Sequence, residues 1–135
     1  MLVTGGLGGL GIVTAEALVE LGATSIVLAS RSGKIKYDGQ GLQERLDALR
    51  ASGATIVIEQ CDTADEQQVI ELLERARCGG YGPLRGVVHA AGVLSDSMLR
   101  SQNEESIRRV VEPKAMGAWY LHKHTTDDAL DIFMT

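Results

Sequence analysis

The first eleven residues of the chain, MLVTGGLGGLG, contain five glycines at a spacing typical of a pyrophosphate-binding turn. They satisfy two patterns at once, G-x-G-x-x-G starting at Gly6 and T-G-x-x-x-G-x-G starting at Thr4. Glycines allow a tight turn and a close approach of phosphate to the backbone, and the helix that follows offers free N–H groups. The alternative is a tight strand-to-helix turn that binds no ligand. The predicted dinucleotide-binding residues are Thr4, Gly5, Gly6, Leu7, Gly8, Gly9, Leu10 and Gly11.

The residues after the second predicted strand indicate which dinucleotide is bound. A site that prefers NADH usually carries Asp or Glu there, to hold the ribose 2′-hydroxyl. This chain has Ser30, Arg31 and Ser32 instead, with no acid. The Arg31 guanidinium can bind a 2′-phosphate with two hydrogen bonds or stack on adenine, and the serines can donate further hydrogen bonds. We therefore predict NADPH as the cofactor; the alternative for Arg31 is a solvent-exposed loop arginine.

Cys61 and Asp62 end the third predicted strand, at the same edge of the sheet. By position, Asp62 can accept a hydrogen bond from the adenine amino group. It can equally cap the helix that follows, as Thr63 can, because short polar side chains are favoured at that position. We include Cys61 in the cofactor site by position and expect it to be a small buried apolar residue.

The elements that position these residues alternate along the chain. Short apolar runs predict strands at 2–3, 25–29, 55–59, 86–90 and 130–135. Helical periodicity predicts helices at 9–21, 42–51, 65–77 and 104–124, the last imperfect at Pro113. Such alternation predicts a parallel sheet covered by helices on both faces. Right-handed crossovers make this a doubly wound α/β sheet, a Rossmann fold with five strands in one domain.

The composition of the whole chain argues against several classes of protein. The net charge of −5 does not favour a nucleic acid or an anionic membrane as a partner. No apolar run reaches the roughly 18 residues that span a bilayer, and the first residues do not form a secretory signal. The two cysteines, Cys61 and Cys78, are too few and too far apart for a zinc ribbon or a disulfide framework. We therefore predict no metal and an intracellular, cytoplasmic location.

Several motifs occur together in the order found in one known family. Besides the glycine run, they are Ser30-Arg31-Ser32, Cys61-Asp62, PLRGVVHAAG at 83–92 and P-K-x-x-G-A-W-x-L-H at 113–122. On these motifs the whole chain resembles the ketoreductase domain of modular polyketide synthases and animal-type fatty acid synthases, in the short-chain dehydrogenase/reductase superfamily. The resemblance implies NADPH-dependent reduction of a β-ketoacyl group to a β-hydroxyacyl group. It also implies two kinds of partner: an acyl carrier protein whose phosphopantetheine arm holds the acyl chain, and neighbouring synthase domains.

The resemblance further assigns residues on the nicotinamide side of the cofactor. Lys114 falls where the family carries a catalytic lysine, which contacts the nicotinamide ribose and lowers the pKa of a tyrosine. Its alternative is an ordinary exposed helix lysine. His89-Ala90-Ala91-Gly92 corresponds to the superfamily stretch Asn-Asn-Ala-Gly, which supports the nicotinamide side. His89 replaces an asparagine there, and we expect it to be structural rather than an acid or a base.

A short stretch after this motif bears on the stereochemistry of the product. Leu94-Ser95-Asp96 resembles the Leu-Asp-Asp stretch of family members that form the D-configured alcohol. Asp96 keeps the diagnostic acid, whereas Ser95 departs from the pattern. The resemblance therefore implies that Leu94 and Asp96 control stereochemistry and that the D-alcohol forms. The alternative is that Asp96 only caps a short turn.

The family pattern also extends beyond both ends of this sequence. The catalytic serine, tyrosine and asparagine would follow Thr135, and a structural subdomain would precede Met1. We therefore expect residues 1–135 to be the NADPH-binding part of a larger ketoreductase, a fragment that binds cofactor poorly and catalyses nothing alone. Two other functions stay open. One is a stand-alone short-chain reductase acting on a small ketone, which the stretch at 113–119 disfavours. The other is a non-catalytic ketoreductase-like subdomain, which the intact glycine loop, Arg31 and Lys114 disfavour.

Overall fold

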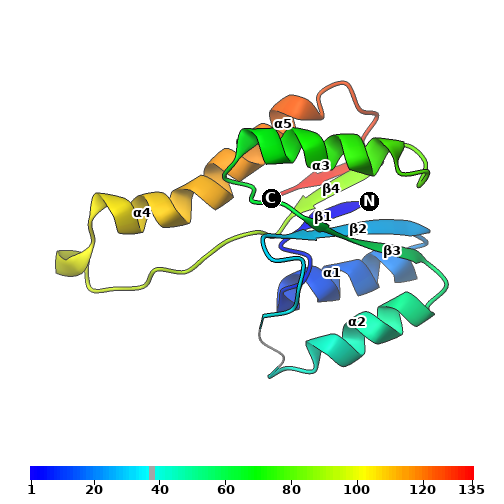
Figure 1. Ribbon diagram of the computed structural model, residues 1–135, viewed down its shortest axis with the longest axis horizontal. Coiled ribbons are helices and arrows are strands. Elements are labelled where there is room, and N and C mark those ends of the chain that lie inside the picture. Colours follow the sequence, from blue (N-terminus) through cyan, green and yellow to red (C-terminus); the bar gives the residue numbers. More distant parts are fainter. Residues whose placement is uncertain (37–38) are drawn as a thin grey trace.

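The computed structural model describes residues 1–36 and 39–135, and a five-stranded parallel sheet runs through its centre (Figure 1). The strands are β1 (Leu2–Thr4), β2 (Ser25–Ser30), β3 (Thr55–Gln60), β4 (Gly86–His89) and β5 (Ile132–Met134), in the order β3-β2-β1-β4-β5. All four pairings are parallel; in β1, for example, Val3 is in register with Leu28 on one side and Val88 on the other. The predicted doubly wound α/β fold is confirmed.

Alternate residues of the central strands are buried on opposite faces of the sheet, as the twofold period of a strand requires. Leu2 packs in one apolar cluster with Leu72 and Leu121, under the helices α3 (Glu66–Cys78) and α5 (Gly117–His124). Val3 packs in the other cluster with Ile12 and Leu46, under α1 (Gly9–Glu20) and α2 (Leu42–Ala51). Since both faces are covered, β1 is buried along its whole length.

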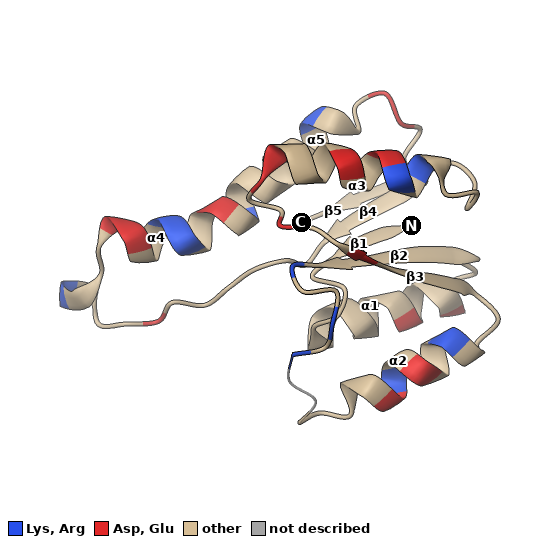
Figure 2. Cartoon of the chain, in the orientation of Figure 1, with Lys and Arg blue, Asp and Glu red and all other residues tan. Residues whose placement is uncertain are grey.

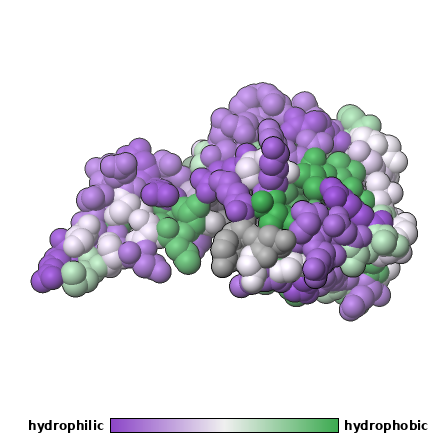
Figure 3. All heavy atoms as spheres, turned by 60° about the horizontal axis from the view of Figure 1, so that its bottom comes forward, coloured by the Kyte–Doolittle hydropathy of each residue, from purple (hydrophilic) through white to green (hydrophobic). Residues whose placement is uncertain are grey.

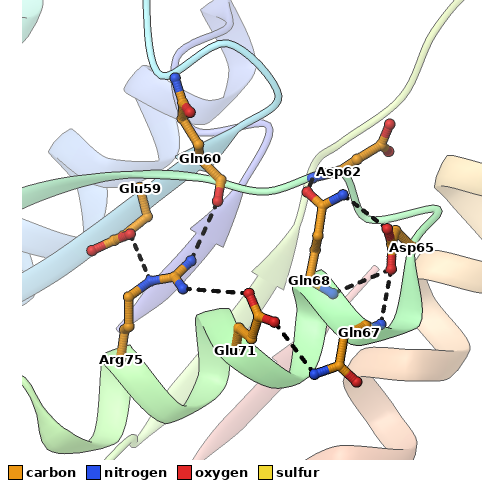
Figure 4. A network of polar contacts seen from close by, with 8 residues as sticks. All are labelled: Glu59, Gln60, Asp62, Asp65, Gln67, Gln68, Glu71 and Arg75. Carbon is orange, nitrogen blue, oxygen red and sulfur yellow. Dashed lines mark hydrogen bonds and ion pairs between the residues drawn. The ribbon is translucent and has the colours of Figure 1, made fainter.

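The N-terminus of α3 is capped by a residue other than the two candidates from the sequence, Asp62 and Thr63 (Figure 4). Asp65 is the N-cap residue, and its carboxylate accepts hydrogen bonds from the backbone N–H groups of Gln67 and Gln68, at 3.0 and 3.3 Å. The alternative that Asp62 or Thr63 caps this helix is therefore wrong. The carboxylate of Asp62 points away from α3 and accepts from the N–H of Ala64 at 3.1 Å, within its own turn.

The helix predicted at 104–124 is divided into three parts. The α-helix α4 (Glu104–Val111) is followed by one π-helical turn, η2 (Glu112–Met116), and then by α5. The prediction of one continuous helix is wrong at this turn, where Pro113 has no N–H to donate. A short 3-10 helix, η1 (Leu99–Ser101), precedes α4.

The segment that carries η1 and α4 projects from the rest of the molecule (Figure 1). We call residues 95–111 the arm; none of its side chains is buried. The body consists of the sheet and the helices packed on it. Within the described ranges, no helix is both long enough and apolar enough to cross a bilayer.

Candidate functional site

A cleft lies at the carboxyl ends of the strands, where the strand order reverses between β1 and β4. Parallel sheets of this kind bind ligands at such a reversal, because the loops on the two sides diverge and leave a crevice. The edge of the crevice is held by backbone hydrogen bonds, from Ala90 N to Thr4 O and from Gly6 N to Ala29 O, both at 3.0 Å. The cleft has a volume of about 250 Å³, and its lining includes Gly5, Leu7, Gly8, Ser30, Arg31, Ser32, Lys34, Lys36, Cys61, Ala90, Ala91 and Gly92.

Three glycines of the loop make room for other parts of the chain. Gly5 has a φ of +67°, and a Cβ atom there would lie 2.5 Å from the carbonyl oxygen of Ala90. A Cβ on Gly6 would lie 2.8 Å from Val3 O, and one on Gly11 would lie 2.3 Å from Gly5 O. These separations are far below van der Waals contact. The three glycines are therefore required by the packing of the loop, whether or not a ligand is present.

Gly8 is different, since its missing side chain faces no crowded backbone. A Cβ there would meet only Gly5 O, at 3.4 Å, and Gly8 itself lines the cleft. It is the N-cap residue of α1 and supplies no side-chain hydrogen bond to the helix. The first N–H groups of a helix have no partner within it and lie at the positive end of its dipole, so an anion can bind there. This end of α1 fits the pyrophosphate of a dinucleotide.

The loop that follows β2 carries several Lys and Arg residues (Figure 2). Three of them, Arg31, Lys34 and Lys36, line the cleft. The loop is anchored to β3, because the Gln60 side chain donates to Ser32 O at 3.0 Å. Neither lysine was predicted as a site residue from the sequence, although the run SRSGKIK places both within five residues of Arg31. Three cations on one wall suit a phosphate group, against the net negative charge of the chain.

The two serines of this loop are already used within it. The Ser30 hydroxyl accepts from Gly33 N at 3.1 Å, and the Ser32 hydroxyl donates to Lys34 O at 2.9 Å. They therefore shape the loop that carries the cations. No hydrogen bond or ion pair joins Arg31 to any other residue in the described part of the chain, which leaves its guanidinium free for a ligand.

Cys61 is buried, as the sequence predicts, and its backbone N–H donates to Ser30 O at 3.1 Å. Burial, and then the negative charge of Asp62, raise the pKa of the Cys61 thiol to about 12. A thiol with such a pKa stays protonated at neutral pH and is a poor nucleophile. Cys61 therefore forms part of the apolar floor of the cleft, whereas Asp62 does not line it.

A second cavity, of about 790 Å³, continues from the far side of Ala90–Gly92. Leu10, His89, Leu94 and Lys114 contribute to its lining together with the shared residues Ala90, Ala91, Gly92 and Val93. The Lys114 side chain lies across Gly92, and a Cβ on Gly92 would be 2.7 Å from Lys114 Cε. The Lys114 ammonium makes no ion pair or hydrogen bond with the residues that the structure describes. It is therefore available at the opening where the two cavities meet.

His89 is held by protein groups on both ring nitrogens. Its Nδ1 lies 2.6 Å from Thr4 Oγ1, and its Nε2 lies 3.0 Å from Pro113 O and 3.1 Å from Lys114 O. Burial lowers the pKa of His89. The hydrogen bonds to the two carbonyl groups act in the opposite direction and only partly offset this effect. The imidazole is therefore neutral at pH 7, and neither nitrogen is free to contact a cofactor.

Some of the remaining predicted residues line the second cavity, and others line neither cavity. Leu94 is exposed and lines the second cavity, whereas Asp96 lines neither cavity. The Asp96 carboxylate caps no turn among the described residues, so that alternative is wrong. Of the other predicted cofactor residues, those that line neither cavity are Thr4, Gly6, Gly9, Gly11 and Asp62. No cluster of His, Cys, Asp or Glu able to hold a metal occurs in residues 1–36 and 39–135.

Comparisons with known proteins agree with this geometry. A protein-family model, described as the KR domain, matches residues 1–135. The chain is 43% identical over 132 residues to a mycocerosic acid synthase-like polyketide synthase of Mycobacterium tuberculosis, with 98% of this chain and 6% of that protein covered. It matches the crystal structure of a ketoreductase domain from the bacillaene assembly line at a TM-score of 0.84 and 32% identity, over 98% of this chain and 31% of the other.

A more distant solved structure shows the wider fold. A short-chain type dehydrogenase/reductase from Mycobacterium ulcerans matches at a TM-score of 0.74 and 30% identity, over 94% of this chain and 45% of the other. The chain thus spans only a small part of the curated relatives and less than half of these solved structures. The family match nevertheless covers every element of the sheet and both cavities. The chain belongs to the ketoreductase (KR) domain family of polyketide synthases and has the short-chain dehydrogenase/reductase fold.

Proposed function

We propose that residues 1–135 are the NADPH-binding part of a reductase that converts a β-ketoacyl thioester into a β-hydroxyacyl thioester. The observation that carries this proposal is the cleft between β1 and β4. The N-terminus of α1, which has no side-chain cap, and the three cationic side chains Arg31, Lys34 and Lys36 all lie at this cleft. A dinucleotide phosphate needs both features: N–H donors for its pyrophosphate and positive charge for its 2′-phosphate. NADPH, when bound, supplies the hydride, and the protein supplies position and electrostatics.

Each wall of the cleft has its own task in this proposal. Gly8 and the start of α1 bind the pyrophosphate. Arg31, with Lys34 and Lys36 beside it, binds the 2′-phosphate. The small residues Ala90, Ala91 and Gly92 leave room for the nicotinamide ribose where the two cavities meet. The Lys114 ammonium lies at this opening, where it can donate to ribose hydroxyls and favour the ionised form of a nearby acid.

We infer the substrate and the partners from the family. The curated relatives include polyketide synthases of which this chain covers a few per cent. We place the chain within such a synthase, with an acyl carrier protein presenting the ketone and with neighbouring domains of the same polypeptide. The proton donor lies outside residues 1–135, so the chain alone does not reduce ketones. We propose that Leu94, which lines the second cavity, and Asp96 direct formation of the D-alcohol, and that the setting is cytoplasmic.

The preference for NADPH is tested by equilibrium titration of the chain with NADPH and with NADH, followed by cofactor fluorescence. We expect NADPH to bind more tightly, because only its 2′-phosphate can use the basic wall. Arg31→Ala should weaken NADPH binding about tenfold or more, the loss of a charged hydrogen bond, and leave NADH binding nearly unchanged. A matched control is Arg50→Ala, which removes an exposed arginine of α2 outside the cleft. Equal affinities for the two cofactors, or equal effects of the two variants, would refute the preference for NADPH.

A further inference from the structure

The π turn η2 places one carbonyl group outside the helical hydrogen-bond ladder. In an α-helix the N–H of Gly117 would donate to the carbonyl oxygen of Pro113, four residues earlier. Here it donates to Glu112 O and Lys114 O instead. The Pro113 carbonyl is directed toward the sheet and away from this N–H. Since buried carbonyl groups need partners, something other than Gly117 must satisfy it.

Two side chains from the body supply those partners. Thr63 Oγ1 donates to Pro113 O at 3.1 Å, and His89 Nε2 contacts Pro113 O and Lys114 O together. Because carbonyl oxygens only accept, Nε2 must carry the ring proton, and Nδ1 of the neutral ring then accepts from the Thr4 hydroxyl. One ring thus connects the end of β1 to the backbone of η2.

The backbone at the end of η2 packs closely against the side chains of Thr63 and His89. A Cβ on Gly117 would lie 2.9 Å from Thr63 Cβ and 3.1 Å from His89 Cε1. The backbone of the turn therefore rests directly on the two side chains that bind it. The same turn carries Lys114, whose carbonyl oxygen contacts His89 and whose side chain lies across Gly92.

We propose that His89 is a positioning residue for Lys114: it holds the Pro113 and Lys114 carbonyl groups, stabilises the π turn, and so fixes the lysine at the opening between the cavities. The role assigned to Lys114 rests on the proposed function. The contact between His89 and the turn does not, so the two can be tested separately.

The first experiment tests the contact in this chain without any activity. Gln and Met have nearly the same shape, but only Gln can donate a hydrogen bond to the two carbonyl groups. We expect His89→Met to speed amide hydrogen exchange at residues 115–118 about fivefold, the effect of one lost hydrogen bond, while His89→Gln stays near wild type. Thr63→Val, which removes the other donor, should act in the same direction. Equal exchange in the Met and Gln variants would overturn the proposal.

The second experiment tests the consequence for Lys114 in the larger reductase that we propose. His89→Met should lower kcat about tenfold or more with little change in KM for NADPH, because a misplaced group affects the reacting geometry more than cofactor binding. His89→Gln should restore most of kcat. In a Lys114→Ala background, His89→Met should have almost no further effect.

The outcomes separate the two proposals. A full additional loss on top of Lys114→Ala would show that His89 acts on something else, and would overturn the positioning role. If the wild-type reductase shows no ketone reduction, the proposed function fails, and the exchange experiment still decides whether His89 holds the turn.

Discussion

The body and the arm of this chain are held by different kinds of interaction. β1 contributes three residues, and all three are buried between two apolar clusters. The arm contains no buried residue, and its apolar side chains Met98, Leu99, Ile107 and Val111 are exposed. Figure 3 shows the arm as a separate projection, with apolar atoms at the surface near the place where it leaves the body. Burial therefore stabilises the body, whereas local hydrogen bonds must stabilise the arm.

The side-chain interactions of α4, in the arm, join residues that are only three or four positions apart in the sequence. Asn103 and Ser106 form a capping box at the start of α4, and Glu104 pairs with Arg108 one turn later, at 2.6 Å. Exposed pairs of this kind contribute little to stability. In the body, by contrast, residues 85 positions apart meet, as Thr4 and His89 do. The cofactor cleft is therefore built by the cooperative part of the molecule, and the arm can change without disturbing it.

The largest expected effect comes from a core substitution in the body compared with one in the arm. Leu72 on α3 is fully buried, while Ile107 on α4 is 54% exposed. Leu72→Ala should lower the free energy of unfolding by about 2–5 kcal/mol, because it removes buried methyl groups and leaves a cavity. Ile107→Ala should change it by no more than about 0.5 kcal/mol. The measurement is urea unfolding followed by circular dichroism, and comparable losses in both variants would contradict the division into body and arm.

A second test separates two functions within the glycine loop. Gly11→Ala should destabilise the body by about 1–3 kcal/mol, since its Cβ would overlap Gly5 O, even though alanine favours helices. Gly8→Ala should cost less than about 1 kcal/mol, because only an ordinary contact is made. It should nevertheless weaken NADPH binding, since the new methyl group enters the cleft. Thermal unfolding and cofactor titration of both variants check this. A Gly8 variant that binds NADPH normally would remove Gly8 from the pyrophosphate site.

Most of the fold could be predicted because it depends on local periodicity. The five strands and the first three helices begin and end within two residues of the predicted positions. The π turn could not be predicted in this way, because its carbonyl groups are held by Thr63 and His89, which lie 50 and 24 residues earlier in the chain. Proline at 113 signalled an irregularity but not its form.

The site shows the same limit. The glycine pattern, Arg31 and Ala90–Gly92 were found from sequence because each has a distinctive local pattern, and the structure brings them to one cleft. Lys34 and Lys36 were missed because their place depends on the anchoring of the loop to β3 through Gln60. The glycine pattern also did not tell which glycines serve packing and which face the ligand. That distinction needs the approach of Ala90 and of the backbone of Gly5, which only the folded loop provides.

The smallest expected effect tests whether the arm is independent of the body. Asn103→Ala removes the capping side chain of α4, which should destabilise that helix locally by about 1 kcal/mol. Amide exchange at residues 105–111 should become about fivefold faster, while the Tm of the chain stays at the wild-type value, because α4 has no buried residue through which to pass the loss to the core. Asn103→Asp keeps the capping oxygen and should behave as wild type. A Tm lowered by several degrees in the alanine variant would mean that the arm shares the cooperative unit of the sheet, and the cleft could then no longer be treated as the property of the body alone.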